Sequence, residues 1–525
     1  MSADQAPKIV IIGAGASGLS FAIALKRQLC FENFMIFERA SSVGGTWRDN
    51  VYPGCTSDIT AHFYSLSTDL NPSWSCSHPP QPELEAYWNQ LSERHSLYPH
   101  ITFNRMVTAA RWDSEKNIYH ITTQDTKTGA QVSTTAHILI SALGILEVPK
   151  LPDIPGMSDF KGSMFHSARW VDIPMTGKRV AVIGNGASAS QFLPIISQIP
   201  NIQVTQFCRT PSWIFPTNRF SSSYEWIFTK FPFMMRLLRV LLFLKFELTY
   251  YIVFHNPIFR RVLTKIIRLY MKQKTPVKYH KVLVPEYDLG CKRVTFNTGY
   301  FAALHRDNVE LNWQGVSSFV DGGIMTNKGE YHPYDVIILA TGYTTDKYPL
   351  IVHGVKGQSI QEYHNAQNGP TAYLGTSTPG FPNFYQLCGP NTATGYISVI
   401  FALETQINYI LKLVRPILDQ KIASLDVSVT ATDEYNSKIQ ARMSDSVFVH
   451  CHSWYRVGGT GKIGSIFPGT STLFWWWLRK PNWDHYCVGG NSLSDRWEPS
   501  RSISSVMGFR TIMGVLGLIG VWCMF

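Results

Sequence analysis

The stretch KIVIIGAGASGLSFAIALKRQL, residues 8–29, decides the fold. Its apolar start predicts a short buried strand, GAGASG predicts a tight turn, and the remainder predicts a helix. Gly13 permits the turn, Gly15 lets the backbone approach a pyrophosphate, and Gly18 lets helix and strand pack closely. The helix N-terminus then faces the anion. The stretch therefore predicts a βα unit that binds a dinucleotide.

A βα unit that binds a dinucleotide is expected to have an acidic residue at the end of its second strand. Here that residue is Glu38, at the end of the predicted strand FMIFE. It follows Gly18 by twenty residues, so its carboxylate can accept a hydrogen bond from a ribose hydroxyl. The alternative is a chance glycine turn in an unrelated α/β unit. Because the strand, the helix and the acidic residue all stand at the spacing that such a unit requires, the sequence favours a dinucleotide site.

A second unit of the same kind begins with a predicted strand over 178–183. GNGASA follows, and its predicted phosphate contacts are Gly184, Gly186, Ala187 and Ser188. The next strand leads to Arg209, at the place where the first unit has an acid. An arginine there favours a 2′-phosphate, so the second site should prefer NADP(H) to NAD(H). The first unit thus has an acidic residue at the ribose position and the second has a basic one. This difference implies FAD in the first unit and NADPH in the second.

Composition and charge limit the other classes of function. The chain has 525 residues, 45% of them hydrophobic, and a formal net charge of +11 without a basic tract of five or more residues. A phosphorylated dinucleotide or a membrane surface fits this charge better than nucleic acid. The nine cysteines include no C-x-x-C pair, which argues against a thiol–disulfide reductase and for a reduced, cytosol-facing body. We predict no metal site.

The predicted fold class is α/β, with two dinucleotide-binding domains of the Rossmann type. Strand-like runs at 136–144 and 335–343 end in small residues, as expected where a chain returns to a nucleotide-binding domain. We therefore expect the NADP domain to be inserted in the FAD domain. The expected bounds are 1–145 and 336–495 for the two parts of the FAD domain, and 146–335 for the NADP domain with a helical insertion at about 221–280.

Six motifs give the sequence a specific resemblance to a known family. They are GGTWRDNVYPGCTSD at 44–58, FKGSMFHSARW at 160–170, CRTPSW at 208–213, PEYDLGCKR at 285–293, GFPNFYQLCGPN at 380–391 and SWYR at 453–456. Together they resemble class B flavoprotein monooxygenases, and among these the Baeyer–Villiger monooxygenases. Val171 departs from the family pattern, which usually has proline or aspartate directly after the tryptophan. Oxidation of amines or sulfides, as in related enzymes, therefore stays open as an alternative.

The resemblance implies an NADPH-dependent flavin monooxygenase that uses molecular oxygen and a C4a-peroxyflavin. Its substrate would be a lipophilic ketone of the secondary-metabolite type, with oxygen inserted beside the carbonyl. Arg293 matches the family's catalytic arginine, and Asp58 matches the carboxylate that holds the arginine's plane. A membrane-attached, non-catalytic flavin-binding protein is the alternative from another class, and the intact Arg293 and Asp58 argue against it.

The resemblance also implies cofactor contacts. Gly45, Thr46, Trp47, Asp58 and Tyr64 would lie near the flavin. Lys292, Arg209 and Thr210 would contact the 2′-phosphate, and Trp454 would lie near the nicotinamide ribose. His166 would help to orient the two domains, with a purely structural histidine as the alternative.

Two apolar regions suggest contact with a membrane. Residues 506–525 are almost wholly apolar and about as long as a bilayer span, so we expect 504–525 to be a single-pass C-terminal anchor. The catalytic body would then face the cytosol from an intracellular membrane. A helix docked on the body is the alternative. Residues 231–254 predict either a buried helical insertion, which we favour, or a hairpin that contacts a membrane.

Overall fold

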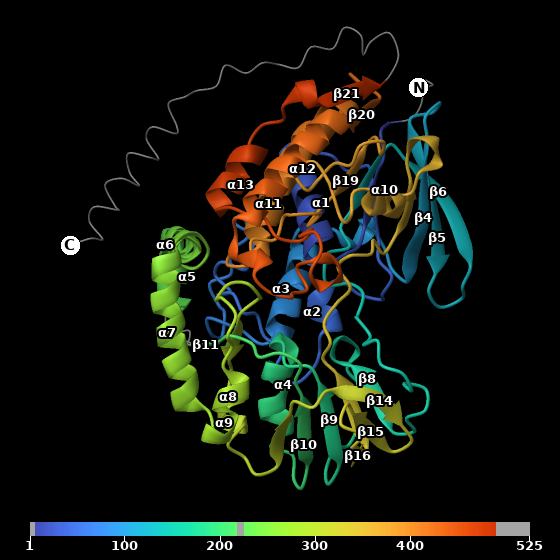
Figure 1. Cartoon of the computed structure of the whole chain (residues 1–525). Coiled ribbons are helices and arrows are strands. Elements are labelled where there is room, and N and C mark those ends of the chain that lie inside the picture. The colour runs from blue at the N-terminus through green and yellow to red at the C-terminus, as the bar shows by residue number, and fades with distance from the viewer. Residues whose placement is uncertain (1–5, 218–224, 490–525) are drawn as a thin grey trace, which may run out of the picture.

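The computed structural model describes residues 6–217 and 225–489, and two parallel five-stranded sheets organise this part of the chain (Figure 1). The first sheet has the strand order β19-β7-β1-β2-β3. Its strands are β1 (Ile9–Ile12), β2 (Phe34–Phe37), β3 (Ile101–Thr102), β7 (Ile138–Ser141) and β19 (Phe384–Gln386). Because β1 is central and fully buried, the first glycine turn leaves the middle of this sheet and leads into α1 (Ala16–Leu29).

The second sheet has the strand order β13-β10-β9-β17-β8. Its strands are β8 (Ser163–His166), β9 (Arg179–Ile183), β10 (Gln203–Phe207), β13 (Val309–Asn312) and β17 (Val336–Leu339). Helix α4 (Ala187–Ile196) follows the central strand β9. The predicted boundary at 335 is too early, because β17 pairs with both β8 and β9 in this sheet.

Smaller sheets extend the two units. A four-stranded sheet contains β4 (Arg105–Asp113), β5 (Ile118–Asp125), β6 (Gln131–Ala136) and β18 (Ile351–His353). A three-stranded sheet contains β14 (Val316–Val320), β15 (Gly323–Thr326) and β16 (Tyr331–Pro333). Two further sheets have two strands each. One consists of β11 (Ile214–Pro216) and β12 (Thr295–Asn297), and the other of β20 (Ser424–Val427) and β21 (Tyr486–Gly489). Since β18 pairs with β4, the chain has returned to the first unit soon after β17.

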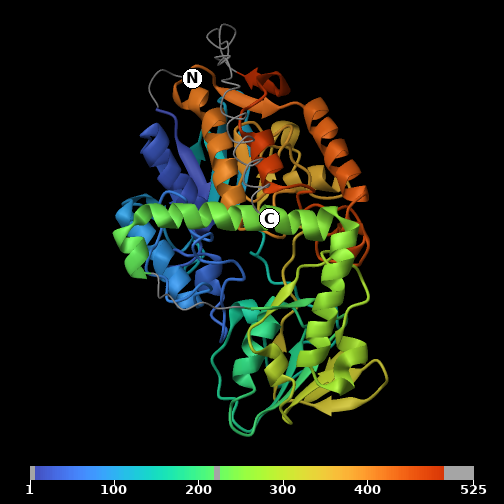
Figure 2. The same cartoon turned by 90° about the vertical axis from the view of Figure 1, so that its left-hand side faces the viewer.

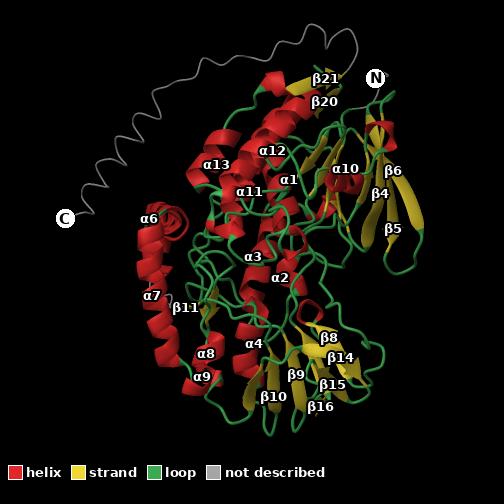
Figure 3. Cartoon of the chain, viewed as in Figure 1, coloured by secondary structure: helices red, strands yellow, loops and turns green. Residues whose placement is uncertain are grey.

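Helices lie against both main sheets, and Figure 3 shows α4 beside β9 and β10, with α1 beside α11 in the first unit. The remaining helices of the two units are α2 (Thr46–Asp49), α3 (Gln81–Arg94), α8 (His280–Leu283), α9 (Tyr300–Ala303), α10 (Ile360–Ala366), α11 (Val399–Leu418), α12 (Val429–Ser444) and α13 (Ser471–Leu478). Helix α11 is apolar on most of its surface and is largely buried, so it forms part of the main hydrophobic core.

The predicted helical insertion is present and lies along one side of the molecule (Figure 2). It contains α5 (Glu225–Lys230), α6 (Pro232–Tyr250), a π-helical turn (Tyr251–His255) and α7 (Pro257–Lys274). The expectation that this insertion is buried is wrong, because Met235 is the one buried residue of α6 and α7 buries only Ile267 and Met271. The outer faces of both helices are exposed.

The predicted localisation through a single-pass membrane helix is contradicted. Within residues 6–217 and 225–489, no helix has the length and apolar character that crossing a membrane requires. The run at 506–525, which motivated the prediction, lies outside the described residues.

The cysteines also differ from expectation. Cys291 and Cys451 form a disulfide across 160 residues of sequence, with Cα atoms 6.1 Å apart. The prediction of a fully reduced body is therefore wrong for this pair. The bond joins the segment that contains GCKR to the segment that contains SWYR.

Candidate active site

The first glycine turn brings two backbone segments into direct contact. A Cβ on Gly18 would lie 1.9 Å from the carbonyl oxygen of Gly13, so only glycine lets α1 begin this close to β1. A Cβ on Gly45 would lie 2.8 Å from the Cα of Gly15, which places the start of α2 at Thr46 beside the turn. The N-terminus of α1 is thus surrounded by bare backbone, as close binding of a pyrophosphate requires.

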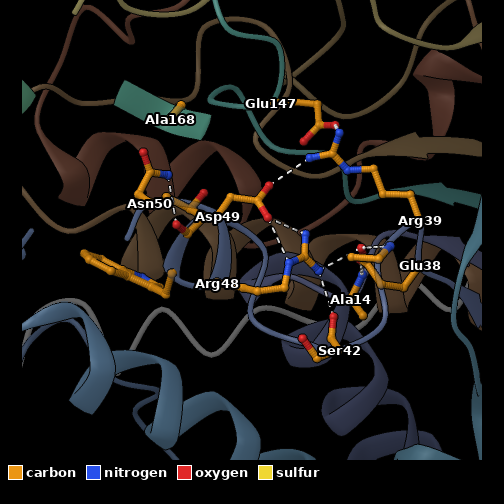
Figure 4. A network of polar contacts seen from close by, with 12 residues as sticks. Ala14, Glu38, Arg39, Ser42, Arg48, Asp49, Asn50, Glu147 and Ala168 are labelled. Carbon is orange, nitrogen blue, oxygen red and sulfur yellow. Dashed lines mark hydrogen bonds and ion pairs between the residues drawn. The ribbon is translucent and has the colours of Figure 1, made fainter. Parts of the chain in front are cut away.

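Glu38 is buried directly after β2 (Figure 4). Its carboxylate accepts hydrogen bonds from the backbone N–H groups of Ala14 (2.8 Å) and Ala40 (2.9 Å) and from the guanidinium of Arg48 (2.9 Å). These bonds fix the carboxylate beside the first turn. Its contact with a ribose hydroxyl stays a prediction.

The same polar network reaches the segment that links the two units. Arg39 forms ion pairs with Asp49 (2.8 Å) and Glu147 (2.9 Å), as Figure 4 shows. Arg169, within the motif FKGSMFHSARW, lies 3.5 Å from Asp49. The motif between the two glycine turns therefore contacts the first unit through the ion pair of Arg169 with Asp49.

His166 ends β8 at the boundary between the two units. Its Nδ1 accepts a hydrogen bond from the Ala168 N–H (3.1 Å), and its ring centroid lies 6.2 Å from that of Tyr343. The Tyr343 hydroxyl donates to Asn50 of the first unit (2.7 Å). Burial lowers the pKa of His166 to about 4, so the imidazole is neutral at neutral pH. A domain-orienting role for His166 stays a prediction.

The second glycine turn repeats the form of the first. A Cβ on Gly184 would lie 2.4 Å from the carbonyl oxygen of Ala340, so this turn also requires close backbone contact. Gly186 is the N-cap of α4, and Ala187 and Ser188 form its first turn. Because Gly186 and Ala187 are exposed, the N-terminus of α4 is open to an anion.

Basic side chains gather near the second turn. Lys292 donates to the Thr210 hydroxyl at 2.9 Å. Burial lowers the pKa of Lys292, and the positive charge of Arg209 lowers it further. The pKa of His452 is also lowered, first by burial and then by Arg209, Lys292 and Lys150. Among the ion pairs of the described residues, none includes Lys150, Arg209 or Lys292. A positive cluster whose lysines and arginine form no ion pair in the described part of the chain fits a phosphate dianion.

Arg293 and Asp58, the predicted catalytic pair, are in direct contact. Asp58 Oδ2 accepts from Arg293 Nη2 at 2.5 Å and from Nε at 3.2 Å, while Nη1 donates to the carbonyl oxygen of Gly395 at 3.1 Å. The Asp58 carboxylate raises the pKa of Arg293. Each side chain keeps 29% of its surface exposed, so this charged pair is held in place but open to a ligand.

Aromatic residues surround the pair. The rings of Trp47 and Tyr64 meet edge to face with centroids 5.6 Å apart. Burial raises the pKa of Tyr455 to about 12, although the nearby charge of Arg293 opposes this shift. Trp454 is 42% exposed and lies 4.5 Å from the Tyr455 ring, centroid to centroid. The structure thus brings the SWYR segment next to Arg293.

A cavity connects the predicted catalytic carboxylate with the second unit. It is lined by Thr56, Ser57, Asp58, His78, Ala187, Ser190, Gln191, Thr217, Thr295, Phe296 and Thr298. Gln191 of α4 accepts a hydrogen bond from the Tyr52 hydroxyl (2.9 Å) and donates to the backbone carbonyl of Thr56 (3.0 Å). The second glycine turn and Asp58 therefore open onto one space.

The match to a family model agrees with this arrangement. The model described as FMO-like, flavin-binding monooxygenase-like, matches residues 6–365. The match includes both glycine turns and covers more than half of the 525 residues. The chain belongs to this family. The flavin monooxygenase is accordingly an oxidoreductase, as predicted.

Several curated proteins resemble this flavin monooxygenase over most of its length. A Baeyer-Villiger monooxygenase of Streptomyces coelicolor is 35% identical over 479 residues, which cover 89% of this chain and 90% of the relative. One of Pseudomonas aeruginosa is 34% identical over 475 residues, with coverage of 89% and 88%. The FAD-binding monooxygenase ktnD of Aspergillus niger is 32% identical over 502 residues, with coverage of 92% and 82%.

Solved structures confirm the predicted fold of the flavin monooxygenase. OTEMO in complex with FAD and NADP superposes with a TM-score of 0.81 at 23% identity, covering 92% of this chain and all of the other. Cyclohexanone monooxygenase from Rhodococcus sp. Phi1 bound to NADP+ gives 0.79 at 22% identity, with the same coverage. At these identities the similarity establishes the fold, with its two Rossmann-type units.

Sequence reasoning missed several residues of the site. Lys150 and His452 join the basic cluster, and Gly395 supplies the carbonyl that holds Arg293. His452 directly precedes SWYR, so its position beside a recognised motif was the available signal. Gly395 and Gln191 had no such signal, because their roles depend on backbone and side-chain directions that only the folded chain defines.

Proposed function

We propose that this flavin monooxygenase binds FAD and NADPH and inserts an oxygen atom beside the carbonyl of a lipophilic ketone. The observation that carries the proposal is the ion pair of Arg293 with Asp58 at the cavity beside the second turn. When bound, FAD supplies oxygen activation and NADPH supplies hydride. In this proposal residues 6–145 and 340–489 hold FAD, and the inserted unit, residues 146–339, holds NADPH.

The chain's own residues fit both nucleotides. The bare backbone around Gly15 and Gly45 suits the FAD pyrophosphate, and the open N-terminus of α4 suits that of NADPH. Arg209 and Lys292 supply positive charge for the 2′-phosphate. The phosphate would provide the negative charge that this cluster lacks.

Arg293 would stabilise negative charge on the reacting oxygen atoms. A guanidinium has five N–H groups, and in the described part of the chain three of them donate to Asp58 and Gly395. The other two can donate to the carbonyl oxygen of a ketone. Since the carboxylate raises the pKa of Arg293, its charge persists at every working pH. A fixed charge in a partly buried site stabilises an oxyanion without reorganisation.

The test is product analysis under isotopically labelled oxygen. The full chain is incubated with FAD, NADPH and a panel of lipophilic ketones, amines and sulfides, and products are identified by mass spectrometry. We expect labelled esters or lactones from ketones, formed in step with NADPH consumption. Labelled products from amines or sulfides alone would replace this proposal with heteroatom oxidation. No NADPH oxidation with any substrate would favour a non-catalytic flavin-binding protein.

A further inference from the structure

The outer faces of α6 and α7 carry large apolar side chains that the fold leaves exposed. We define the outer stripe as Phe233, Leu237, Val240, Leu241 and Leu248 of α6 with Ile258, Phe259, Val262, Ile266 and Leu269 of α7. Each of these residues exposes between 47% and 67% of its surface. Spacings of three, four and seven residues place them along one side of each helix. Figures 1 and 2 show both helices on the same side of the molecule.

The face of α6 opposite the outer stripe packs against the rest of the protein. The outer stripe is therefore not the face through which α6 joins the hydrophobic core. Phe243 and Phe246 lie against a cluster that includes Phe63 and Tyr396. The Arg239 guanidinium donates to two backbone carbonyls of the first unit, at 2.8 and 3.0 Å. These contacts fix the rotation of α6 about its axis, and they leave the stripe pointing outward.

The carboxylate of Glu247 adds to this fixation. It accepts hydrogen bonds from the Tyr396 hydroxyl and the Ser471 N–H, both at 2.9 Å, and from the Thr472 hydroxyl at 2.8 Å. Glu247 is the only acidic residue between positions 231 and 274. The single carboxylate of α6 and α7 is therefore hydrogen-bonded within the protein and does not add negative charge to the outer stripe.

The charges that border the outer stripe are positive. Residues 231–274 include nine lysines and arginines, and those exposed are Arg236, Lys245, Arg261, Lys265, Lys272 and Lys274. An apolar band with a basic border matches the interface of a membrane that carries anionic headgroups. A second copy of this chain fits less well, because pairing two such faces would bring like charges together.

We propose that the outer stripe docks this enzyme on the surface of a membrane that contains anionic lipids. Helices α6 and α7 lie in the plane of the interface, with the apolar side chains at the boundary between headgroups and acyl chains. The bordering lysines and arginines pair with lipid phosphates. This mode of attachment is peripheral and requires no helix that crosses the bilayer. It is also independent of the oxidation proposed above.

The first test measures binding of the full chain to vesicles by co-sedimentation. We expect stronger binding to phosphatidylcholine vesicles that contain phosphatidylserine than to phosphatidylcholine alone, and weaker binding at high salt. The double variant Leu241→Glu and Val262→Glu should reduce binding to the anionic vesicles by about tenfold or more, because two charges would enter the apolar boundary. The matched control is Val132→Glu with Val429→Glu, two valines exposed to 53% and 59% elsewhere on the surface.

The charge of the border is tested separately. Arg261→Glu with Lys265→Glu should remove the preference for phosphatidylserine, because two residues that attract anionic headgroups would then repel them. Retained flavin and an unchanged circular dichroism spectrum establish that every variant is folded. The proposal is overturned if the parent does not co-sediment with anionic vesicles. It is also overturned if the Leu241→Glu, Val262→Glu variant binds these vesicles as strongly as the parent does. A parent dimer that this variant converts to a monomer in light scattering would also overturn it, and would assign the stripe to a second copy.

Discussion

Lys292 and Arg293 are neighbours in sequence, but their electrostatic surroundings are opposite. Arg293 contacts the Asp58 carboxylate, which raises its pKa. The pKa of Lys292 is lowered by burial and by Arg209, and no acid within the described residues pairs with it. The chain thus places a compensated charge beside an uncompensated one. The difference supports the two proposed tasks, in which the Arg293 charge would serve the chemistry and the Lys292 charge would bind an anion.

Removing the compensated charge should have the largest effect. Arg293→Ala should lower ester formation by about 10²–10³-fold, the range for losing one oxyanion-stabilising group. Flavin reduction by NADPH should persist, because hydride transfer does not need this charge. Stopped-flow spectroscopy measures reduction, and product analysis measures ester formation.

Arg293→Lys is the control for charge. It keeps a cation but cannot hold Asp58 and Gly395 through a planar fork, so we expect intermediate rates. Ester formed by Arg293→Ala at the parent's rate would show that Arg293 is not the stabilising group.

Removing charge from the uncompensated cluster should affect the coenzyme instead. Arg209→Ala should raise the KM for NADPH by about 10- to 100-fold, because a hydrogen bond to a charged group contributes about 1.5–3 kcal/mol. The KM for NADH, which lacks the 2′-phosphate, should change little. Steady-state rates with both coenzymes measure this difference, and equal preference for the two in the parent would remove the basis for assigning Arg209.

The contrast between the two residues could be predicted only in part from sequence. The glycine turns, GGTW and GCKR have fixed local patterns, so they identified the Rossmann-type units and the candidate residues. The Cys291–Cys451 bond left no pattern, because its partners are 160 residues apart. The exposure of α6 was also missed, since a helix with apolar residues on both sides has a sequence typical of burial.

The orientation of the compensated charge should matter less than its presence. Asp58→Ala leaves Arg293 positive but removes two of the three hydrogen bonds that hold its plane. We expect ester formation to fall by about tenfold, because a reactive group that is less well oriented reaches the productive geometry less often. Hydrogen peroxide released per NADPH consumed should rise. A loss as large as that of Arg293→Ala would mean that Asp58 does more than orient the arginine.

The smallest effect should be the pH dependence of the uncompensated charge. In the proposed site only protonated Lys292 would attract the 2′-phosphate, and the pKa of Lys292 is lowered from the ordinary value of about 10.4. Raising the pH through this lowered pKa therefore removes the charge and should raise the KM for NADPH. The increase should be at most about fivefold, because Lys292 is partly exposed and exposed ion pairs contribute up to about 1 kcal/mol.

Lys292→Arg separates this titration from other effects of alkaline pH. An arginine stays protonated across the range, so the KM for NADPH in this variant should not rise with pH. The KM for NADH should be flat in both proteins, because NADH offers no 2′-phosphate to the cluster. Ester formation from saturating NADPH should keep the same pH profile in both, since the charge of Arg293 does not titrate. If the parent and Lys292→Arg lost NADPH affinity equally at high pH, the titrating group would not be Lys292, and the distinction between the two neighbours would fail.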